Sequence, residues 1–139
     1  MAGDDPLEFA FQVDRFMRRL NARVHAQAPE FDREKVGPIG GMILMTLAEV
    51  QPAPMQRISA MMGRDKAQLS RMFSSLERKE LVVRSANSAD LRSSLLSLTP
   101  KGEELVVAIK GAVGGAIGEL LDPLNDEERA EMLRLLAKT

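Results

Sequence analysis

The sequence has no cysteine, no tryptophan and no tyrosine, and its 139 residues include a single histidine, His25. The absence of cysteine excludes disulfides, zinc fingers and thiol-based switches. One histidine without a second histidine or a cysteine makes a poor zinc site, so neither a metal nor a cofactor is expected. Because 45% of the residues are apolar, the chain can bury a core without covalent links, and residues 1–139 are expected to form a single domain.

Long apolar runs are also absent. No uncharged stretch approaches the roughly 18 residues that a membrane span requires, and residues 1–6 are acidic where a signal peptide would be basic. A cytoplasmic location is therefore expected. The sequence also lacks a histidine pair, a cysteine nucleophile and a phosphate-binding glycine loop, so we do not expect an enzyme.

Charge is distributed unevenly along the chain. The net charge is −1, yet the segment from Met55 to Lys101 holds nine basic and four acidic residues, a net charge of +5, which leaves −6 for the two flanks. The middle of the chain is therefore where a polyanion such as a nucleic acid would bind. A solvated helix face is the alternative explanation, which charge alone does not exclude.

Helical periodicity predicts three helices before residue 64. The first covers about 5–28, with Asp5 as its N-cap and Glu8 where a capping box requires an acid. A charged loop over 29–36 and a second helix follow. A third, short helix is expected to end at Gly63 and to turn its apolar residues inward, namely Ile58, Met61 and Met62.

Apolar residues recur with a helical period in the fourth helix and with a strand-like pattern in the segment after it. Asp65 is a suitable N-cap with Gln68 at the third helical position, and the apolar face of this helix consists of Leu69, Met72, Phe73 and Leu76. After Glu80 the pattern changes to that of two short strands, 81–84 and 94–98. Together these strands predict a β-hairpin.

Two more helices are predicted, beginning at Thr99 and at Asn125, which are suitable N-caps. Apolar residues cover more than half of the circumference of the first, so it needs burial on two sides. It also carries glycines at 111, 114, 115 and 118, which either allow a close backbone crossing or mark a hinge. The last helix is expected to turn four side chains inward, namely Met132, Leu133, Leu135 and Leu136.

Residues 55–73 have the spacing of a helix-turn-helix. A wheel with about 100° per residue places a strip of small, hydroxyl and arginine side chains opposite the buried face, namely Ala67, Ser70, Arg71, Ser74 and Arg78. Such a strip suits a DNA major groove, because small residues allow close approach and arginine bonds guanine bidentately. An ordinary amphipathic helix is the alternative for this helix taken alone. The basic excess and the following hairpin favour DNA.

Five short motifs resemble those of the MarR family of winged-helix regulators (multiple antibiotic resistance regulators). They are DKAQLSRM at 65–72, LERK at 76–79, LVVR at 81–84, DLR at 90–92 and LTPKG at 98–102. The resemblance is strongest over 37–102. The outer helices agree with the family in length and order only.

The resemblance implies a mainly α fold with a small β-hairpin wing. A winged helix-turn-helix DNA-binding core over 37–102 would be flanked by dimerisation helices at 5–28 and 100–138. The implied protein is a homodimeric transcriptional repressor that binds a pseudo-palindromic double-stranded DNA operator and is released by a small aromatic or anionic ligand. Candidates to line the ligand site are Arg15, Arg18, Arg19, Met42 and Met45.

The family's DNA contacts map onto Ser70, Arg71 and Arg92, with Arg92 reaching toward the minor groove. Asp90 is expected to stabilise the wing by pairing with a neighbouring arginine. Since the wing tip has no basic residue, minor-groove contact would depend on Arg84 and Arg92 alone. The full set of expected DNA contacts is Lys66, Ala67, Gln68, Ser70, Arg71, Ser74, Arg78, Arg84, Asn87 and Arg92.

Two expectations qualify this interpretation. Glu80 stands where the family usually has glycine, so a non-glycine residue must adopt the left-handed conformation after the recognition helix. The alternative function is a winged helix that binds proteins without specific DNA recognition. That alternative would be favoured if Arg71 and Arg92 proved dispensable for DNA binding.

Overall fold

The computed structural model describes residues 5–29 and 34–139, which form two compact units. One unit joins the two ends of the chain, up to Gln27 and from Ala112, and the other runs from Ala28 to Gly111. Residues 1–4 of the acidic N-terminus and residues 30–33 of the expected loop lie outside the described residues. Within the described ranges, no helix is both long and apolar enough to span a membrane.

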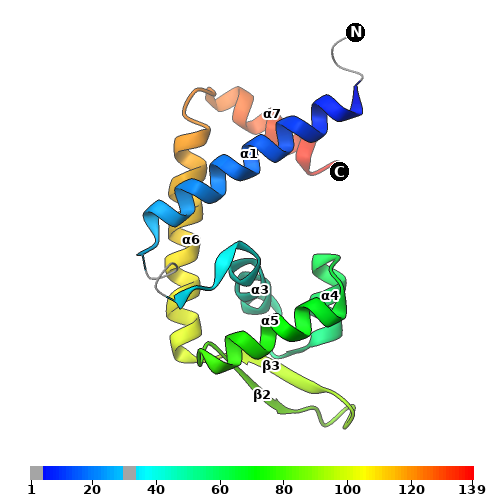
Figure 1. The fold of residues 1–139 in the computed structure, drawn as a ribbon. Helices are drawn as coiled ribbons and strands as arrows, with labels where there is room; N and C mark the ends of the chain where they lie inside the picture. Colours follow the sequence, from blue (N-terminus) through cyan, green and yellow to red (C-terminus); the bar gives the residue numbers. More distant parts are fainter. Residues whose placement is uncertain (1–4, 30–33) are drawn as a thin grey trace. The chain divides into compact units, whose positions relative to one another are not determined.

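Helices dominate the chain, and a small antiparallel sheet accompanies them (Figure 1). This confirms the mainly α fold with a β-hairpin wing. The helices are α1 (Pro6–Gln27), α3 (Gly37–Val50), α4 (Met55–Met62), α5 (Lys66–Arg78), α6 (Pro100–Leu120) and α7 (Asp126–Leu136). The strands are β1 (Ala53–Pro54), β2 (Val82–Ala86) and β3 (Ser94–Leu98).

The sheet has three strands in the order β1-β3-β2, one more than the sequence predicts. β2 and β3 form the expected hairpin, with Val82 opposite Leu98 and Ala86 opposite Ser94. The two-residue strand β1 pairs Ala53 with Leu96. Its length and its proline hide it from periodicity analysis, because proline normally argues against a strand except at a sheet edge.

The core of the 28–111 unit lies where α3, α4 and α5 meet the sheet. Its side chains are fully buried and come from every one of these elements, namely Ile43, Leu44, Leu47, Ile58, Leu69, Phe73 and Leu96. Apolar burial of this kind contributes about 1.5–3 kcal/mol per large side chain. The core therefore fixes α5 against the wing.

The turn between α4 and α5 is built as the sequence predicts. Gly63 ends α4 in the left-handed conformation, with φ of 61°, a conformation that glycine adopts without steric cost. The Ser59 hydroxyl donates to the Arg64 carbonyl at 2.8 Å. Asp65 then caps α5, its carboxylate accepting from the Ala67 amide at 3.3 Å.

Several hydrogen bonds hold the junction between α5 and β2, Glu80-Leu81. Glu80 has φ of 61°, which confirms the expected left-handed residue. The Leu81 amide donates to the Leu76 carbonyl at 3.0 Å, and the Leu81 carbonyl accepts from Thr99 at 3.1 Å. The Thr99 hydroxyl donates to the Glu80 carbonyl at 2.6 Å. These hydrogen bonds therefore connect the end of α5, the start of the wing and the start of α6.

In the other unit, α1 and α7 expose most of their apolar side chains. Phe11 is 67% and Leu133 is 71% exposed, and Phe9, Val13 and Leu136 are exposed as well. The prediction that Leu133, Leu135 and Leu136 point inward is therefore wrong for the single chain. These helices have apolar faces that the described part of one chain leaves uncovered.

Glycine-rich α6 is one uninterrupted helix in the structure. Among the glycines at 111, 114, 115 and 118, only Gly115 would bring an added Cβ into collision with a neighbour, the Gln27 side chain of α1, whereas open space surrounds the other three. Gln27 also donates to Glu119 at 2.8 Å. One glycine of the four thus allows a close contact with α1.

Three local predictions are wrong. Met61 was expected to point inward but is 49% exposed, and Ile58 is the one residue of α4 that is buried. Glu8 does not complete a capping box, since its carboxylate accepts from Gln12 at 2.9 Å, although Asp5 does cap α1 through the Leu7 amide. Within the expected loop 29–36, residues 29 and 34 are helical.

Gly102 gives the fold its first testable prediction. A Cβ at this position would collide with the backbone carbonyl of Leu81, which the junction holds in place. We expect Gly102→Ala to lower the free energy of unfolding by roughly 2–3 kcal/mol, as overpacking against rigid backbone does. Urea unfolding followed by circular dichroism measures this. Gly111→Ala, in the same helix but in open space, is the control and should not destabilise; equal loss in both variants contradicts the account.

Candidate nucleic-acid interface

Helix α5 is anchored on one side and free on the other. Leu69, Phe73 and Leu76 are buried against the core, and the helix lies beside the β2-β3 hairpin (Figure 1). Its opposite face is the strip predicted from the helical wheel, in which Ala67, Arg71 and Arg78 are exposed and Ser70 and Ser74 are half-buried. Of the other expected contacts on α5, Lys66 is exposed and Gln68 is half-buried.

The wing tip is held by its own side chains. The Asn87 amide donates to the Ser93 hydroxyl at 3.0 Å and accepts from the Ala89 backbone at 3.1 Å. Asp90 accepts from the Arg92 backbone amide at 3.0 Å. Asp90 therefore stabilises the wing through a backbone hydrogen bond. Among the ion pairs of the described residues, the expected pair between Asp90 and an arginine is not formed, so that prediction is wrong.

Arg84 is held by α5. Its Nε atom forms an ion pair with the Glu77 carboxylate, and each side chain is about one third exposed, 35% and 32%. This pair joins β2 to α5 and partly neutralises Arg84. Sequence analysis identified Arg84 but missed Glu77, because the two residues lie on different elements and only the fold brings them together.

Four of the expected DNA contacts come together in one hollow. This helix–wing hollow, of about 220 Å³, lies between the start of α5 and the wing and is lined by Gln56, Lys66, Ser70, Arg84, Arg92 and Ser94, among others. Arg71, Ser74 and Arg78 lie outside it, on the exposed strip of α5. The site therefore has two parts, a protruding strip and a basic hollow.

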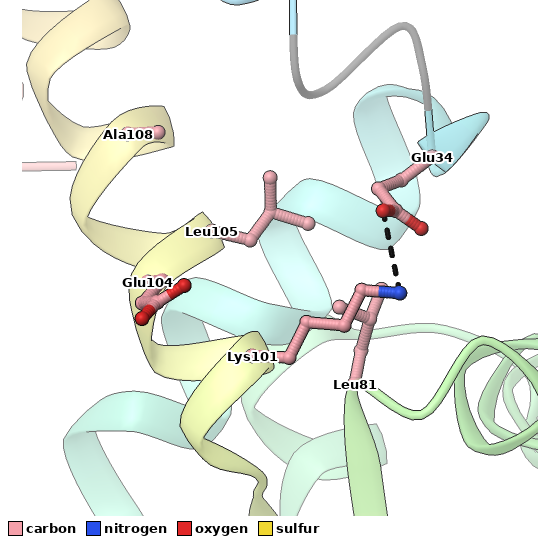
Figure 2. Close-up of a pocket in the computed structure, with 6 residues that line it drawn as sticks. All are labelled: Glu34, Leu81, Lys101, Glu104, Leu105 and Ala108. Atoms are coloured by element: carbon pink, nitrogen blue, oxygen red, sulfur yellow. Dashed lines mark ion pairs between the residues drawn. The ribbon is translucent and has the colours of Figure 1, made fainter.

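A second hollow lies at the other end of α5. This junction hollow, of about 190 Å³, is lined by Glu34, Leu81, Lys101, Glu104, Leu105 and Ala108 (Figure 2). Lys101 Nζ lies 3.3 Å from the Glu34 carboxylate and also donates to the Lys79 carbonyl at 3.1 Å. Lys79 in turn donates to the Lys35 carbonyl at 2.9 Å. Through Lys101, the hollow is therefore linked to Lys79, the residue that follows α5.

None of the side chains expected at a ligand site lines the junction hollow. Arg15 and Arg19 instead line a groove of about 490 Å³ between α1 and α7, and Arg18 pairs with Asp14 on the surface of α1. Met42 is 45% exposed on α3. Lys101 is part of the LTPKG motif, but the sequence contains no local signal that Glu34 is its ion-pair partner.

Comparison with known proteins agrees with this geometry. Residues 41–94, which include α4, α5 and β2 and end at the first residue of β3, match the model of the MarR family. An uncharacterised HTH-type transcriptional regulator of Bacillus subtilis, YxaD, is 28% identical over 109 residues, which are 78% of this chain and 74% of that protein.

Two solved structures extend the likeness to nearly the whole chain. A probable transcriptional regulator from Pseudomonas aeruginosa has a TM-score of 0.80 at 25% identity and covers 97% of both chains. A mutant MarR from E. coli, complexed with operator DNA, has a TM-score of 0.82 over 94% of this chain and 92% of that one. At 20% identity, the second likeness shows the fold.

Proposed function

Because the chain belongs to the MarR family, we propose that it is a sequence-specific DNA-binding transcriptional regulator. The observation that carries the proposal is the pairing of a protruding strip on α5, on which Arg71 is exposed, with a wing that hydrogen bonds and an ion pair hold beside it. A helix of this kind enters the major groove, and the wing lies over the adjacent minor groove. The protein would act by binding, in the cytoplasm, and not by catalysis.

The uncovered apolar faces of α1 and α7 support a homodimer. Between these helices lies a groove of about 670 Å³, lined by Phe9, Val13, Met132, Leu135 and Leu136, among others. Soluble monomers seldom expose such contiguous apolar surface. A second copy of the chain covers it by symmetry and gives the molecule two recognition helices, which suits a pseudo-palindromic operator. A dimer that occupies a promoter in this way would act as a repressor.

The winged helix as a protein-interaction module is the weaker proposal. The exposed side of α5 carries arginines and hydroxyls, whereas the centres of protein interfaces are depleted in charge. The apolar surface that a protein partner would use lies instead on α1 and α7. The membership of the MarR family also favours DNA.

Arg71 is expected to discriminate between DNA sequences. Replacing Arg71 with alanine should cost about 1–3 kcal/mol on the preferred duplex and less on a shuffled duplex, because bidentate contacts to a base are lost while phosphate contacts remain. Fluorescence anisotropy with both duplexes measures this. Arg18→Ala removes the same charge from the surface of α1, where Arg18 is 80% exposed. This control should leave the ratio of the affinities for the preferred and the shuffled duplex unchanged. Equal binding of the preferred duplex by the Arg71 variant and the parent would contradict the assignment of Arg71 to base recognition.

Leu133 is expected to lie in the dimer interface. Since Leu133 is 71% exposed in the single chain, Leu133→Glu should leave the subunit folded but make it a monomer. Operator binding should weaken about a hundredfold or more, because the second recognition helix of the dimer is lost. Sedimentation velocity and anisotropy test this. Leu91→Glu, at a wing position that is 90% exposed, is the control and should remain dimeric. A Leu133 variant that stays dimeric contradicts the interface.

We also propose that a small aromatic carboxylate releases the operator by entering the junction hollow. Leu81, Leu105 and Ala108 give the hollow an apolar wall, and Lys101 offers a cation now shared with Glu34. A ligand carboxylate that pairs with Lys101 would break its ion pair with Glu34 and its hydrogen bond to the Lys79 carbonyl. The end of α5 would then be held less firmly.

Benzoate is a suitable probe of this release. Millimolar benzoate should weaken operator binding several-fold in the parent and in Lys110→Met, which alters an exposed lysine farther along α6. It should have no effect on Lys101→Met. Anisotropy at fixed ionic strength measures the difference, and an unchanged response in the Lys101 variant would place the ligand elsewhere.

A further inference from the structure

Leu91 is the most exposed large apolar side chain among the residues that the structure describes, with 90% of its surface open to solvent. It lies in the loop that joins β2 to β3, directly between Asp90 and Arg92. A single exposed leucine is common on protein surfaces. Its position at the tip of the wing is what calls for an explanation.

Hydrogen bonds shape this loop into two successive turns. The Asp90 amide donates to the Asn87 carbonyl at 3.2 Å, and the Ser93 amide donates to the Asp90 carbonyl at 3.2 Å. In the second turn the two central residues, which form its corner, are Leu91 and Arg92. The Asp90 carboxylate accepts from the Arg92 amide at 3.0 Å and so supports this corner. The wing therefore presents an apolar side chain and a cation side by side.

The surroundings of Leu91 favour a nucleic acid over a protein as its partner. Ser88, Asp90 and Arg92 are exposed around it, so the loop forms no contiguous apolar patch of the kind that protein interfaces use. The minor groove of DNA suits this pair of side chains better. Its negative potential attracts an arginine, and minor-groove proteins often place an apolar side chain, leucine included, against the bases.

An apolar side chain in the minor groove distinguishes between base pairs. A·T pairs present acceptors there, whereas G·C pairs add the 2-amino group of guanine, a hydrogen-bond donor. That amino group projects from the floor of the groove and would lose its water against a leucine without gaining another partner, which is unfavourable. A leucine in the groove therefore favours A·T pairs.

We propose that Leu91 is a specificity-determining residue that selects A·T pairs under the wing tip by contact with the floor of the minor groove. The proposal rests on the DNA-binding function proposed above. Arg92, its neighbour at the corner of the turn, supplies electrostatic attraction to the same groove, and Leu91 supplies discrimination by exclusion of the guanine amino group. Leu91 thereby extends the recognised sequence beyond the base pairs that Arg71 contacts in the major groove.

Base analogues in the flanks of the selected operator test this proposal. Inosine lacks the 2-amino group of guanine and keeps its major-groove face, and 2,6-diaminopurine adds that group to adenine. At the base pairs under the wing of one half-site, the parent should bind A·T and inosine·C duplexes alike. It should bind G·C and diaminopurine·T duplexes about tenfold more weakly, as expected for one unfavourable base pair. Fluorescence anisotropy measures the four affinities.

Leu91→Ala should reduce this discrimination to about twofold, since most of the apolar contact is lost. It should keep the parental slope of log K against log salt, because no charge changes, and the parental stability in urea. Arg92→Gln, in contrast, should lower that slope. Val107→Ala is the matched control, because it shortens another exposed apolar side chain, 72% exposed on α6, and should keep the discrimination.

Two results would overturn the inference alone. One is a Leu91 variant that still discriminates tenfold, and the other is a parent that selects its operator but treats the four base pairs alike at every position in the flank. A Leu91 variant that binds all four duplexes equally less well than the parent also contradicts it, because the leucine would then add affinity without selecting base pairs. If the parent prefers no duplex over a shuffled one, the proposed function fails instead.

Discussion

The rest of the structure depends on the short junction Glu80-Leu81. Its two backbone groups bond back to α5 through Leu76 and forward to Thr99 at the start of α6, and Gly102 leaves just enough room for the Leu81 carbonyl. A left-handed glutamate at this point stores strain of about 1–2 kcal/mol, which the surrounding hydrogen bonds and core offset. Since the junction allows little freedom, α5 and the wing behave as one body, and a duplex meets a preformed surface.

Two hollows lie at the opposite ends of this body. The helix–wing hollow at the first turn of α5 is basic, and the junction hollow, lined by Leu81 just after α5, combines an apolar wall with the Glu34–Lys101 pair. A helix of 13 residues separates them by about 20 Å. The Lys101 and Lys79 contacts hold the end of α5, so a ligand that broke them would act on this helix. If the proposed ligand releases the operator, repression and release would both act through α5, which would then need two discrete arrangements.

Periodicity predicted the order of the helices and the hairpin because each element has a strong local signal. The N-cap at Asp65, the turn at Gly63 and the buried face of α5 are all set by residues within one or two turns of each other. The outer helices show the limit of this approach. The leucines of α7 have a helical pattern that indicates burial, but their cover lies outside the single chain. Pairings between elements, such as Arg84 with Glu77 and Lys101 with Glu34, likewise have no local signal, since tertiary structure alone brings the partners together.

The account's central claim is that a dimer recognises specific sites in double-stranded DNA. Its most direct test is to incubate the purified protein with sheared genomic DNA from its source at near-physiological salt, and to sequence the fragments that it retains. The account predicts enrichment of a short pseudo-palindrome whose half-sites lie about one helical turn apart, or a multiple of it. Weak, uniform recovery that vanishes when salt is added would contradict it, because that pattern reflects phosphate contacts alone.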